Sequence, residues 1–116
     1  ALNQSINDER GQWLLGSTHA EAVSEYPLTV LTEGQPKRFV IDRSFVDNEG
    51  VRWIIDYKTS THEGGNLEGF IDEEVVRYTE QLRGYRDAMQ MLEPERVIRT
   101  ALYFPLLKVF RELKLT

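Results

Sequence analysis

Runs of apolar residues, some alternating with polar ones and some continuous, occupy much of the chain and predict strands. A period of two is typical of a strand with one buried face, and a short continuous apolar run fits a fully buried strand. Pro27 lies in the first of these runs, which favours an edge strand or a strand start there. The predicted strands are residues 25–32, within the segment 20–32, and residues 38–47, 51–59, 97–104 and 109–115.

Two other segments have the spacing of helices. Residues 72–93 repeat apolar side chains at steps of three and four, and we expect Asp72 to cap this helix and Pro94 to end it. Residues 5–15 predict a short N-terminal helix. The order helix, three strands, helix, two strands predicts an α/β domain with a mixed or antiparallel sheet.

The composition restricts the class of protein. At 116 residues and 41% hydrophobic content, the chain fits one globular domain spanning residues 1–116. It contains no cysteine, which excludes a disulfide scaffold and a thiolate zinc site. It has no apolar run long enough to span a membrane and no signal peptide. The net charge of −5 argues against binding nucleic acid through bulk charge alone.

The segment Asn48-Glu49-Gly50 determines the expected register of the central hairpin. It suits a three-residue loop in which a type I turn is followed by a glycine in the left-handed conformation. Such a loop pairs Asp47 with Val51 and places Asp42 opposite Asp56. Alternation along the first hairpin strand predicts that one face carries Phe39, Ile41, Arg43 and Phe45, and that the other carries Asp42.

Asp42 and Asp56 form a pair of carboxylates that needs compensation. Opposed side chains in antiparallel strands have Cβ atoms about 4.5–5.5 Å apart, and like charges there are destabilising. A divalent cation relieves the repulsion, and Mg²⁺ commonly binds one or two carboxylates together with waters and phosphate oxygens. Lys58 follows Asp56 by two residues and therefore shares its face. The pattern favours a metal or catalytic site; the alternative is a solvated face with two unrelated carboxylates.

These residues resemble the signature of the RecB-type nucleases, a branch of the PD-(D/E)XK superfamily found at the C-terminus of RecB- and AddA-like helicase-nucleases. The resemblance lies in Ile41-Asp42-Arg43 followed by Trp53-Ile-Ile-Asp56-Tyr57-Lys58-Thr59. A Gln-x-x-x-Tyr pair on the helix, Gln81-Leu-Arg-Gly-Tyr85, preceded by Tyr78, adds the family's second element. The resemblance covers about residues 22–107.

The resemblance implies a role for each residue of the central constellation. Asp42, Asp56 and the backbone carbonyl of Tyr57 would bind Mg²⁺ or Mn²⁺. Lys58 would orient the attacking water and offset charge on the scissile phosphate. The implied reaction is metal-assisted hydrolysis of a phosphodiester.

Four further residues receive supporting roles from the resemblance. Gln81 and Tyr85 would face the metal site and contact the DNA backbone, although spacing alone leaves Gln81 equally able to be exposed. Glu25 matches an acidic position that the family often carries. Arg43 either packs over an aromatic ring or contacts a phosphate.

The family's fold is a restriction-endonuclease-like core, with a mixed sheet whose central antiparallel hairpin is flanked by helices. The family usually carries a metal-binding histidine on an upstream helix, whereas the one histidine before Asp42 is His19. Because the chain also lacks an initiator methionine, we expect a C-terminal fragment with a truncated N-terminal helix and an incomplete metal site.

The biological role that the resemblance implies is a metal-dependent DNA exonuclease domain of an ATP-dependent helicase-nuclease in double-strand-break repair and recombination. Its expected partners are DNA, helicase domains of the same parent chain and a second helicase-nuclease subunit, without a membrane. The expected location is the cytoplasm. The alternative is a catalytically inactive nuclease-like module that binds DNA or packs on the helicase body.

Overall fold

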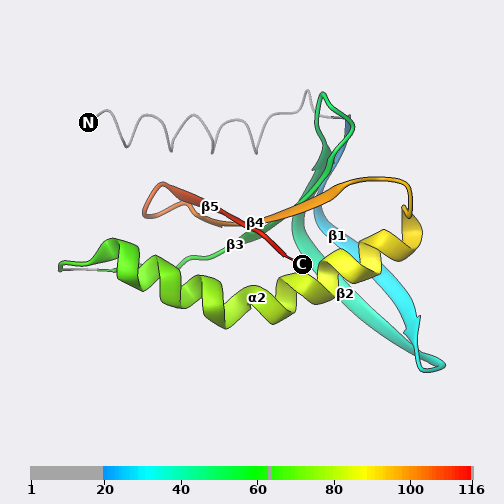
Figure 1. Cartoon of the computed structure of the whole chain (residues 1–116), viewed down its shortest axis with the longest axis horizontal. Helices are drawn as coiled ribbons and strands as arrows, with labels where there is room; N and C mark the ends of the chain where they lie inside the picture. Colours follow the sequence, from blue (N-terminus) through cyan, green and yellow to red (C-terminus); the bar gives the residue numbers. More distant parts are fainter. Residues whose placement is uncertain (1–19, 63, 116) are drawn as a thin grey trace.

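The computed structural model of the chain describes residues 20–62 and 64–115. The predicted helix at residues 5–15 and His19 lie outside the described residues. Figure 1 shows one long helix beside a sheet of five strands. The elements are β1 (Ala20–Thr32), β2 (Gln35–Val46), β3 (Arg52–Tyr57), α2 (Leu67–Leu92), β4 (Ile98–Phe104) and β5 (Val109–Leu113).

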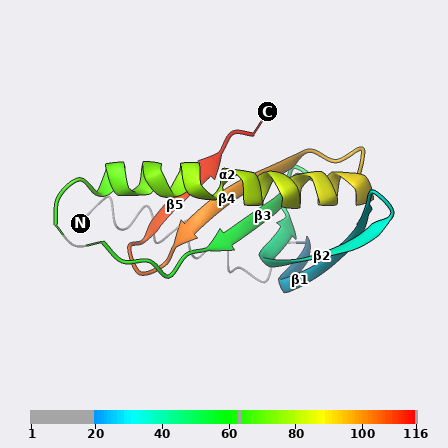
Figure 2. The same cartoon turned by 90° about the horizontal axis from the view of Figure 1, so that it is seen from below.

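The sheet is mixed, which confirms the predicted α/β class. Its strand order is β1-β2-β3-β4-β5, with β3 and β4 parallel and the other neighbours antiparallel. Parallel neighbours need a crossover connection, and α2 supplies it along one face of the sheet (Figure 2). β1 lies at an edge of the sheet, as Pro27 within it indicates.

The turn between β2 and β3 has the geometry and register that the sequence predicts. Gly50 adopts a left-handed φ of 80°, and its N–H donates to the Asp47 carbonyl at 3.0 Å. The Asp47 carboxylate accepts from the N–H groups of Glu49 and Val51 and from the indole N–H of Trp53. The strands then pair Phe45 with Trp53, in the expected register.

The helix α2 begins more than a turn earlier than predicted. Its N-cap is Asn66, whose side chain accepts the Gly69 N–H at 3.1 Å, so the prediction that Asp72 caps the helix is wrong. Gly69 gives this segment the composition of a loop, but Phe70 and Ile71 extend the apolar stripe of α2 into the core. The predicted end before Pro94 is confirmed, since the C-cap is Glu93.

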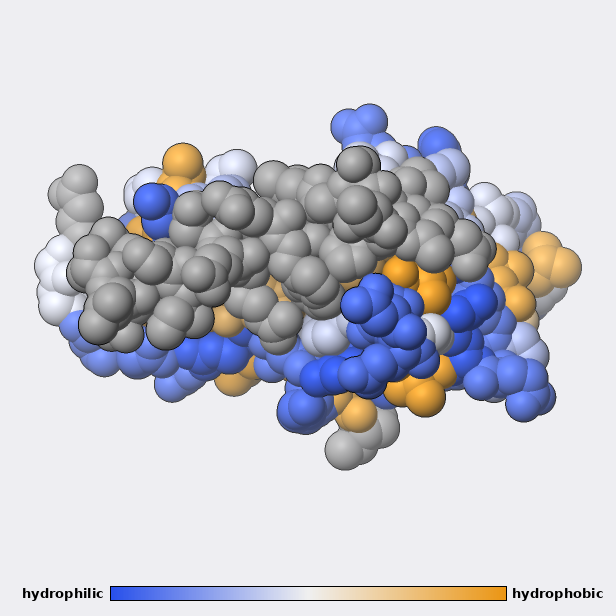
Figure 3. Space-filling view, turned by 90° about the horizontal axis from the view of Figure 1, so that it is seen from above, coloured by the Kyte–Doolittle hydropathy of each residue, from blue (hydrophilic) through white to orange (hydrophobic). Residues whose placement is uncertain are grey.

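The two faces of the sheet carry separate groups of buried side chains. α2 packs over the first group, which includes Ile41, Ile54, Leu82, Met89 and Leu102. The second group lies on the opposite face of the sheet. Figure 3 views the molecule from the side away from α2, and both apolar and hydrophilic residues appear among its coloured atoms. It comprises Phe45, Trp53, Ile55, Ala101 and Tyr103.

Side chains of β2 do not keep to one face along the strand. Phe45 lies in the second group, whereas Ile41 is buried in the helix-side group and Phe39 packs edge-on against Tyr85 with ring centroids 5.5 Å apart. The prediction that Phe39, Ile41 and Phe45 share a face is therefore wrong. Before Arg43, in its N-terminal part, β2 pairs only with β1, and two-stranded ribbons twist more strongly than wider sheets.

A buried ion pair joins the start of β3 to the end of α2. Arg52 is 1% exposed, and its guanidinium donates to both carboxylate oxygens of Glu93, at 3.0 and 2.7 Å. The contact holds α2 against the sheet at the end that is remote from Asp56. Within the described residues, no helix combines the length and apolar character that crossing a lipid bilayer requires.

Candidate functional site

Asp42 and Asp56 meet where β2 separates from β3. The last pair that the two strands form is Arg43 with Ile55, so Asp42 and Asp56 are the next residues in the register. The Asp42 carboxylate replaces the missing strand partner, because its Oδ2 accepts the N–H of Tyr57 at 2.8 Å. The hairpin register thus brings two carboxylates together at the C-terminal end of β3.

The environment of Asp56 disfavours its ionised form. The residue is 5% exposed, and burial raises its pKa to about 6, against the opposing effect of Lys58. The carboxylate of Asp42 raises the pKa of Asp56 further, both as a hydrogen-bond partner and as a nearby negative charge. A buried carboxylate beside a second one is a place where an added cation is strongly favoured.

The ammonium of Lys58 lies against the carboxylate of Asp56. Its Nζ is 2.7 Å from Asp56 Oδ2, and only 15% of the lysine side chain is exposed. The same Nζ lies 3.4 Å from the centroid of the Tyr78 ring. Backbone pairing of β3 continues to this residue, since the Lys58 N–H donates to the Tyr103 carbonyl at 2.8 Å.

Helix α2 contributes the predicted Gln-x-x-x-Tyr pair to the same place. The Gln81 amide donates to the hydroxyl of Tyr85 at 2.7 Å, one helical turn away. Burial raises the pKa of Tyr85, the hydrogen bond from Gln81 opposes this rise, and the charges of Asp56 and Asp42 add to it. The hydroxyl of Tyr85 therefore lies within electrostatic reach of both carboxylates, while Gln81 remains exposed to solvent.

Two predicted site residues are placed differently. Arg43 is 9% exposed, donates to the Ser24 hydroxyl at 3.2 Å and pairs with Ile55, which puts it on the face opposite α2. It lies near Tyr57 on that face, so the packing alternative fits it better than a phosphate contact. Glu25 lies on β1 beside Asp42 in the strand pair, but with an exposed side chain and a left-handed φ of 53°.

The donor set of the site fits a hard divalent cation. Mg²⁺ and Mn²⁺ bind oxygen ligands, and Asp42 and Asp56 present carboxylate oxygens next to one another. Among the described residues, no group of three histidine, aspartate or glutamate side chains is arranged to hold a metal ion. Asp42 and Asp56 thus bring two carboxylates together at this place, one fewer acidic side chain than such a group contains.

Two contacts at this site and near it are not evident from the sequence. By its spacing in the sequence, Tyr78 is one more member of the apolar stripe of α2. In the structure its ring lies over the ammonium of Lys58. Glu74, one turn earlier, is 6% exposed, and its Oε2 lies 3.9 Å from Nε of Arg77. The sequence signal for both is a polar or hydroxyl-bearing residue within the buried stripe of a helix.

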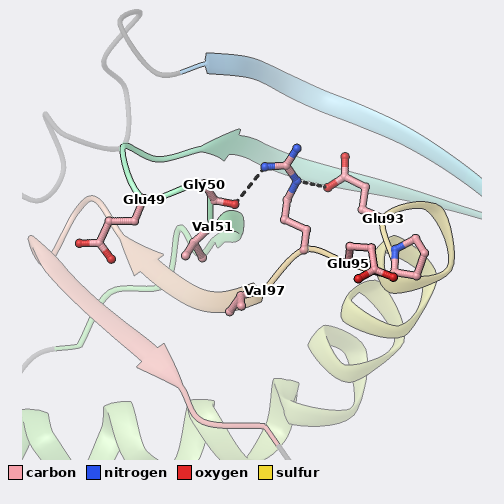
Figure 4. Close-up of a pocket in the computed structure, with 8 residues that line it drawn as sticks. Glu49, Gly50, Val51, Glu93, Glu95 and Val97 are labelled. Atoms are coloured by element: carbon pink, nitrogen blue, oxygen red, sulfur yellow. Dashed lines mark hydrogen bonds and ion pairs between the residues drawn. The ribbon is translucent and has the colours of Figure 1, made fainter.

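A separate pocket of about 540 Å³ lies at the other end of β3. Arg96 is one of the residues that line it, and its guanidinium donates to the Gly50 carbonyl at 2.9 Å and lies 3.1 Å from the Glu93 carboxylate. Figure 4 draws the lining residues, with Gly50 and Glu93 labelled. Glu49 and Glu95 also line the pocket, and none of the predicted site residues does. The pocket is therefore distinct from the carboxylate site.

Comparison of the chain with protein-family models found no match, and comparison with curated proteins found no significant match.

Proposed function

We propose that the chain is a metal-dependent nuclease domain that hydrolyses phosphodiester bonds in DNA. The observation that carries the proposal is the meeting of Asp42 and Asp56 with the ammonium of Lys58, 2.7 Å from Asp56, at the C-terminal end of β3. Two carboxylates and a cation in one place match the needs of phosphoryl transfer, which requires a divalent ion and a positive charge at the phosphate.

Each residue of the site has a role in this reaction. Asp42 and Asp56 hold Mg²⁺ or Mn²⁺, with the backbone carbonyl of Tyr57 as a further ligand. An ion held there would supply Lewis-acid polarisation of a phosphoryl oxygen and would lower the pKa of the attacking water. Lys58 orients that water and stabilises negative charge that develops on the phosphate. Gln81 and Tyr85 position the DNA backbone.

The finer proposal places the chain in the RecB-type branch of the PD-(D/E)XK superfamily, with a restriction-endonuclease-like core. In that context it is the exonuclease domain of an ATP-dependent helicase-nuclease in double-strand-break repair. DNA, the helicase domains of the parent chain and a second helicase-nuclease subunit are its partners, in the cytoplasm. The support is the spacing of the Asp42, Asp56 and Lys58 motif together with the Gln81–Tyr85 pair 2.7 Å apart.

The experiment that tests the proposal is DNA cleavage in Mg²⁺ or Mn²⁺, measured on this chain and on the longer protein expected to carry it. Lys58→Ala is expected to lower turnover by about 10²–10³-fold, because an ammonium that acts on developing charge contributes mainly in the transition state. Gln81→Ala is expected to cost less, since it acts on substrate position. In the longer protein, ATP hydrolysis is expected to remain nearly unchanged.

The matched control is Lys37→Ala on the same hairpin. Lys37 is exposed and lies 5.3 Å from the Phe39 ring centroid, so its removal changes the net charge equally without touching the carboxylates. Cleavage that survives Lys58→Ala within about threefold would remove Lys58 from the mechanism. Absence of cleavage by both unmodified proteins would overturn the enzymatic proposal in favour of a module that only binds DNA.

A further inference from the structure

Within the part of the chain that the structure describes, the Lys58 ammonium contacts a carboxylate and an aromatic ring. It lies 2.7 Å from Asp56 on one side and 3.4 Å from the centroid of the Tyr78 ring on the other. Tyr78 comes from α2, whereas Asp56 lies on β3 and Lys58 is the first residue after the end of that strand. The contact therefore depends on how the helix docks on the sheet and is not a consequence of strand alternation.

We propose that Tyr78 is the positioning residue for Lys58, and that the face of its ring holds the ammonium beside Asp56. The inference rests on the proposed function insofar as the position of Lys58 matters for cleavage. An aromatic face attracts an ammonium through its negative quadrupole, and the attraction grows when water is excluded. Here the lysine side chain is 15% exposed, so the contact is largely desolvated.

The Tyr78 ring restricts the position of the Lys58 ammonium, which the ion pair with Asp56 alone does not fix. A lysine has a flexible four-carbon stem and three equivalent donors, so a single ion pair does not define where its ammonium points. When a cation binds Asp56, the attraction that this carboxylate exerts on Lys58 weakens. The Tyr78 ring carries no charge that the cation can neutralise, and it keeps the ammonium at the site.

The contribution belongs to the ring and not to the hydroxyl, which makes the test selective. Tyr78→Phe keeps the ring, whereas Tyr78→Leu and Tyr78→Met keep an apolar side chain without it. The matched control is Phe70→Leu, eight positions earlier on α2, where the ring stacks on His62 at 4.7 Å and does not contact Lys58. This control removes a half-buried aromatic ring from the same helix.

The first measurement is the NMR position of the Lys58 ε-methylene protons in the full chain, without metal or DNA. A ring above the ammonium shifts them upfield through its ring current. The upfield shift is expected in the unmodified chain, in Tyr78→Phe and in Phe70→Leu, and its loss is expected in Tyr78→Leu and Tyr78→Met. An unshifted signal in the unmodified chain, or a shift that persists without the ring, would overturn the inference.

The second measurement is the cleavage rate at saturating and at limiting DNA. Tyr78→Leu is expected to lower kcat about tenfold with little change in KM, and Tyr78→Phe is expected to restore the rate. A loss of the upfield shift with unchanged kcat would refute the positioning role. If the unmodified chain does not cleave DNA, the proposed function fails, and the NMR result alone decides the contact between Tyr78 and Lys58.

Discussion

Asp56 is a residue at which burial and a neighbouring carboxylate both oppose a negative charge. Its pKa is raised to about 6 by burial and by Asp42, although the ammonium of Lys58 is 2.7 Å away. Groups whose ionisation is disfavoured by their surroundings concentrate at functional sites, because a side chain with a purely structural role gains nothing from such a placement. Asp47, on the same hairpin, shows the opposite situation, since every contact of its carboxylate is a donor.

The first prediction concerns Asp56→Asn in the absence of metal. Between the usual aspartate pKa of 3.8 and the folded pKa of about 6, the folded state binds more protons than the unfolded state, so stability falls as the pH rises through this window. The variant carries no charge and is expected to be more stable than the unmodified chain at pH 8, by about 1–3 kcal/mol. The gain is expected to vanish near pH 4. Urea unfolding at both values measures it.

Asp47→Asn is the matched control for that measurement. Against the opposing effect of burial, the hydrogen bond from Trp53 and those from two backbone N–H groups lower the pKa of Asp47. Its ionised form therefore stabilises the fold, and the variant is expected to be less stable at pH 8. Destabilisation by Asp56→Asn at pH 8 would contradict the electrostatic description of the site.

At the scale of elements, the start of α2 determines which side chains reach the site and the core. The cap at Asn66 adds a turn whose Phe70 and Ile71 pack into the helix-side core. Asn66→Ala is expected to destabilise the chain by about 1–2 kcal/mol. The substitution removes the side-chain oxygen that accepts the Gly69 N–H, and it places an alanine at a left-handed φ of 62°, which alanine adopts less readily than asparagine. Thermal unfolding checks the value.

Asp72→Ala serves as the comparison, because Asp72 is the cap that the sequence predicts. In the structure Asp72 lies within α2 and is exposed, with an ion pair to Arg111 at 2.9 Å. Such exposed pairs contribute about 0–1 kcal/mol. A larger loss of stability from Asp72→Ala than from Asn66→Ala would indicate that the helix begins at Asp72, as the sequence predicts.

The joint between β3 and α2 makes a second prediction at this scale. The hydrogen bond from Arg52 lowers the pKa of Glu93. The stabilising effect of the carboxylate is therefore present above the usual glutamate pKa of 4.5 and is lost as the pH falls through the lower folded pKa. Glu93→Gln is expected to cost about 1–3 kcal/mol at pH 7 and less at pH 3. Urea unfolding of Glu95→Gln, an exposed neighbour, supplies the control. An equal loss of stability in Glu93→Gln and Glu95→Gln would contradict a stabilising role for the Arg52–Glu93 pair.

These elements also show what the sequence can and cannot predict. The hairpin register follows from Asn48-Glu49-Gly50 because a turn is a local structure, and with it the meeting of Asp42 and Asp56. The change of face between Phe45 and Ile41 along β2 depends on where the pairing with β3 ends. The local sequence of β2 does not determine that point. The contact between Lys58 and Tyr78 depends on the docking of α2, a long-range property of the fold.

At the scale of the whole molecule, the site and the structural joint lie at opposite ends of β3. Arg52 opens this strand with its buried pair to Glu93, and Asp56 lies near its other end with Lys58 just beyond. The end with the joint holds α2 in place, which allows the other end to retain two carboxylates in an unfavourable setting. The separation explains how a small domain tolerates a destabilised site.

The most direct test of this account is calorimetric titration of the chain with Mn²⁺ and Mg²⁺. We expect one weak site, with its heat of binding abolished by Asp42→Ala and by Asp56→Ala, because the two carboxylates form the donor set. Glu95→Gln, at the opposite end of β3, is expected to bind metal like the unmodified chain. Undiminished binding by Asp56→Ala would contradict the assignment of these carboxylates as the metal site.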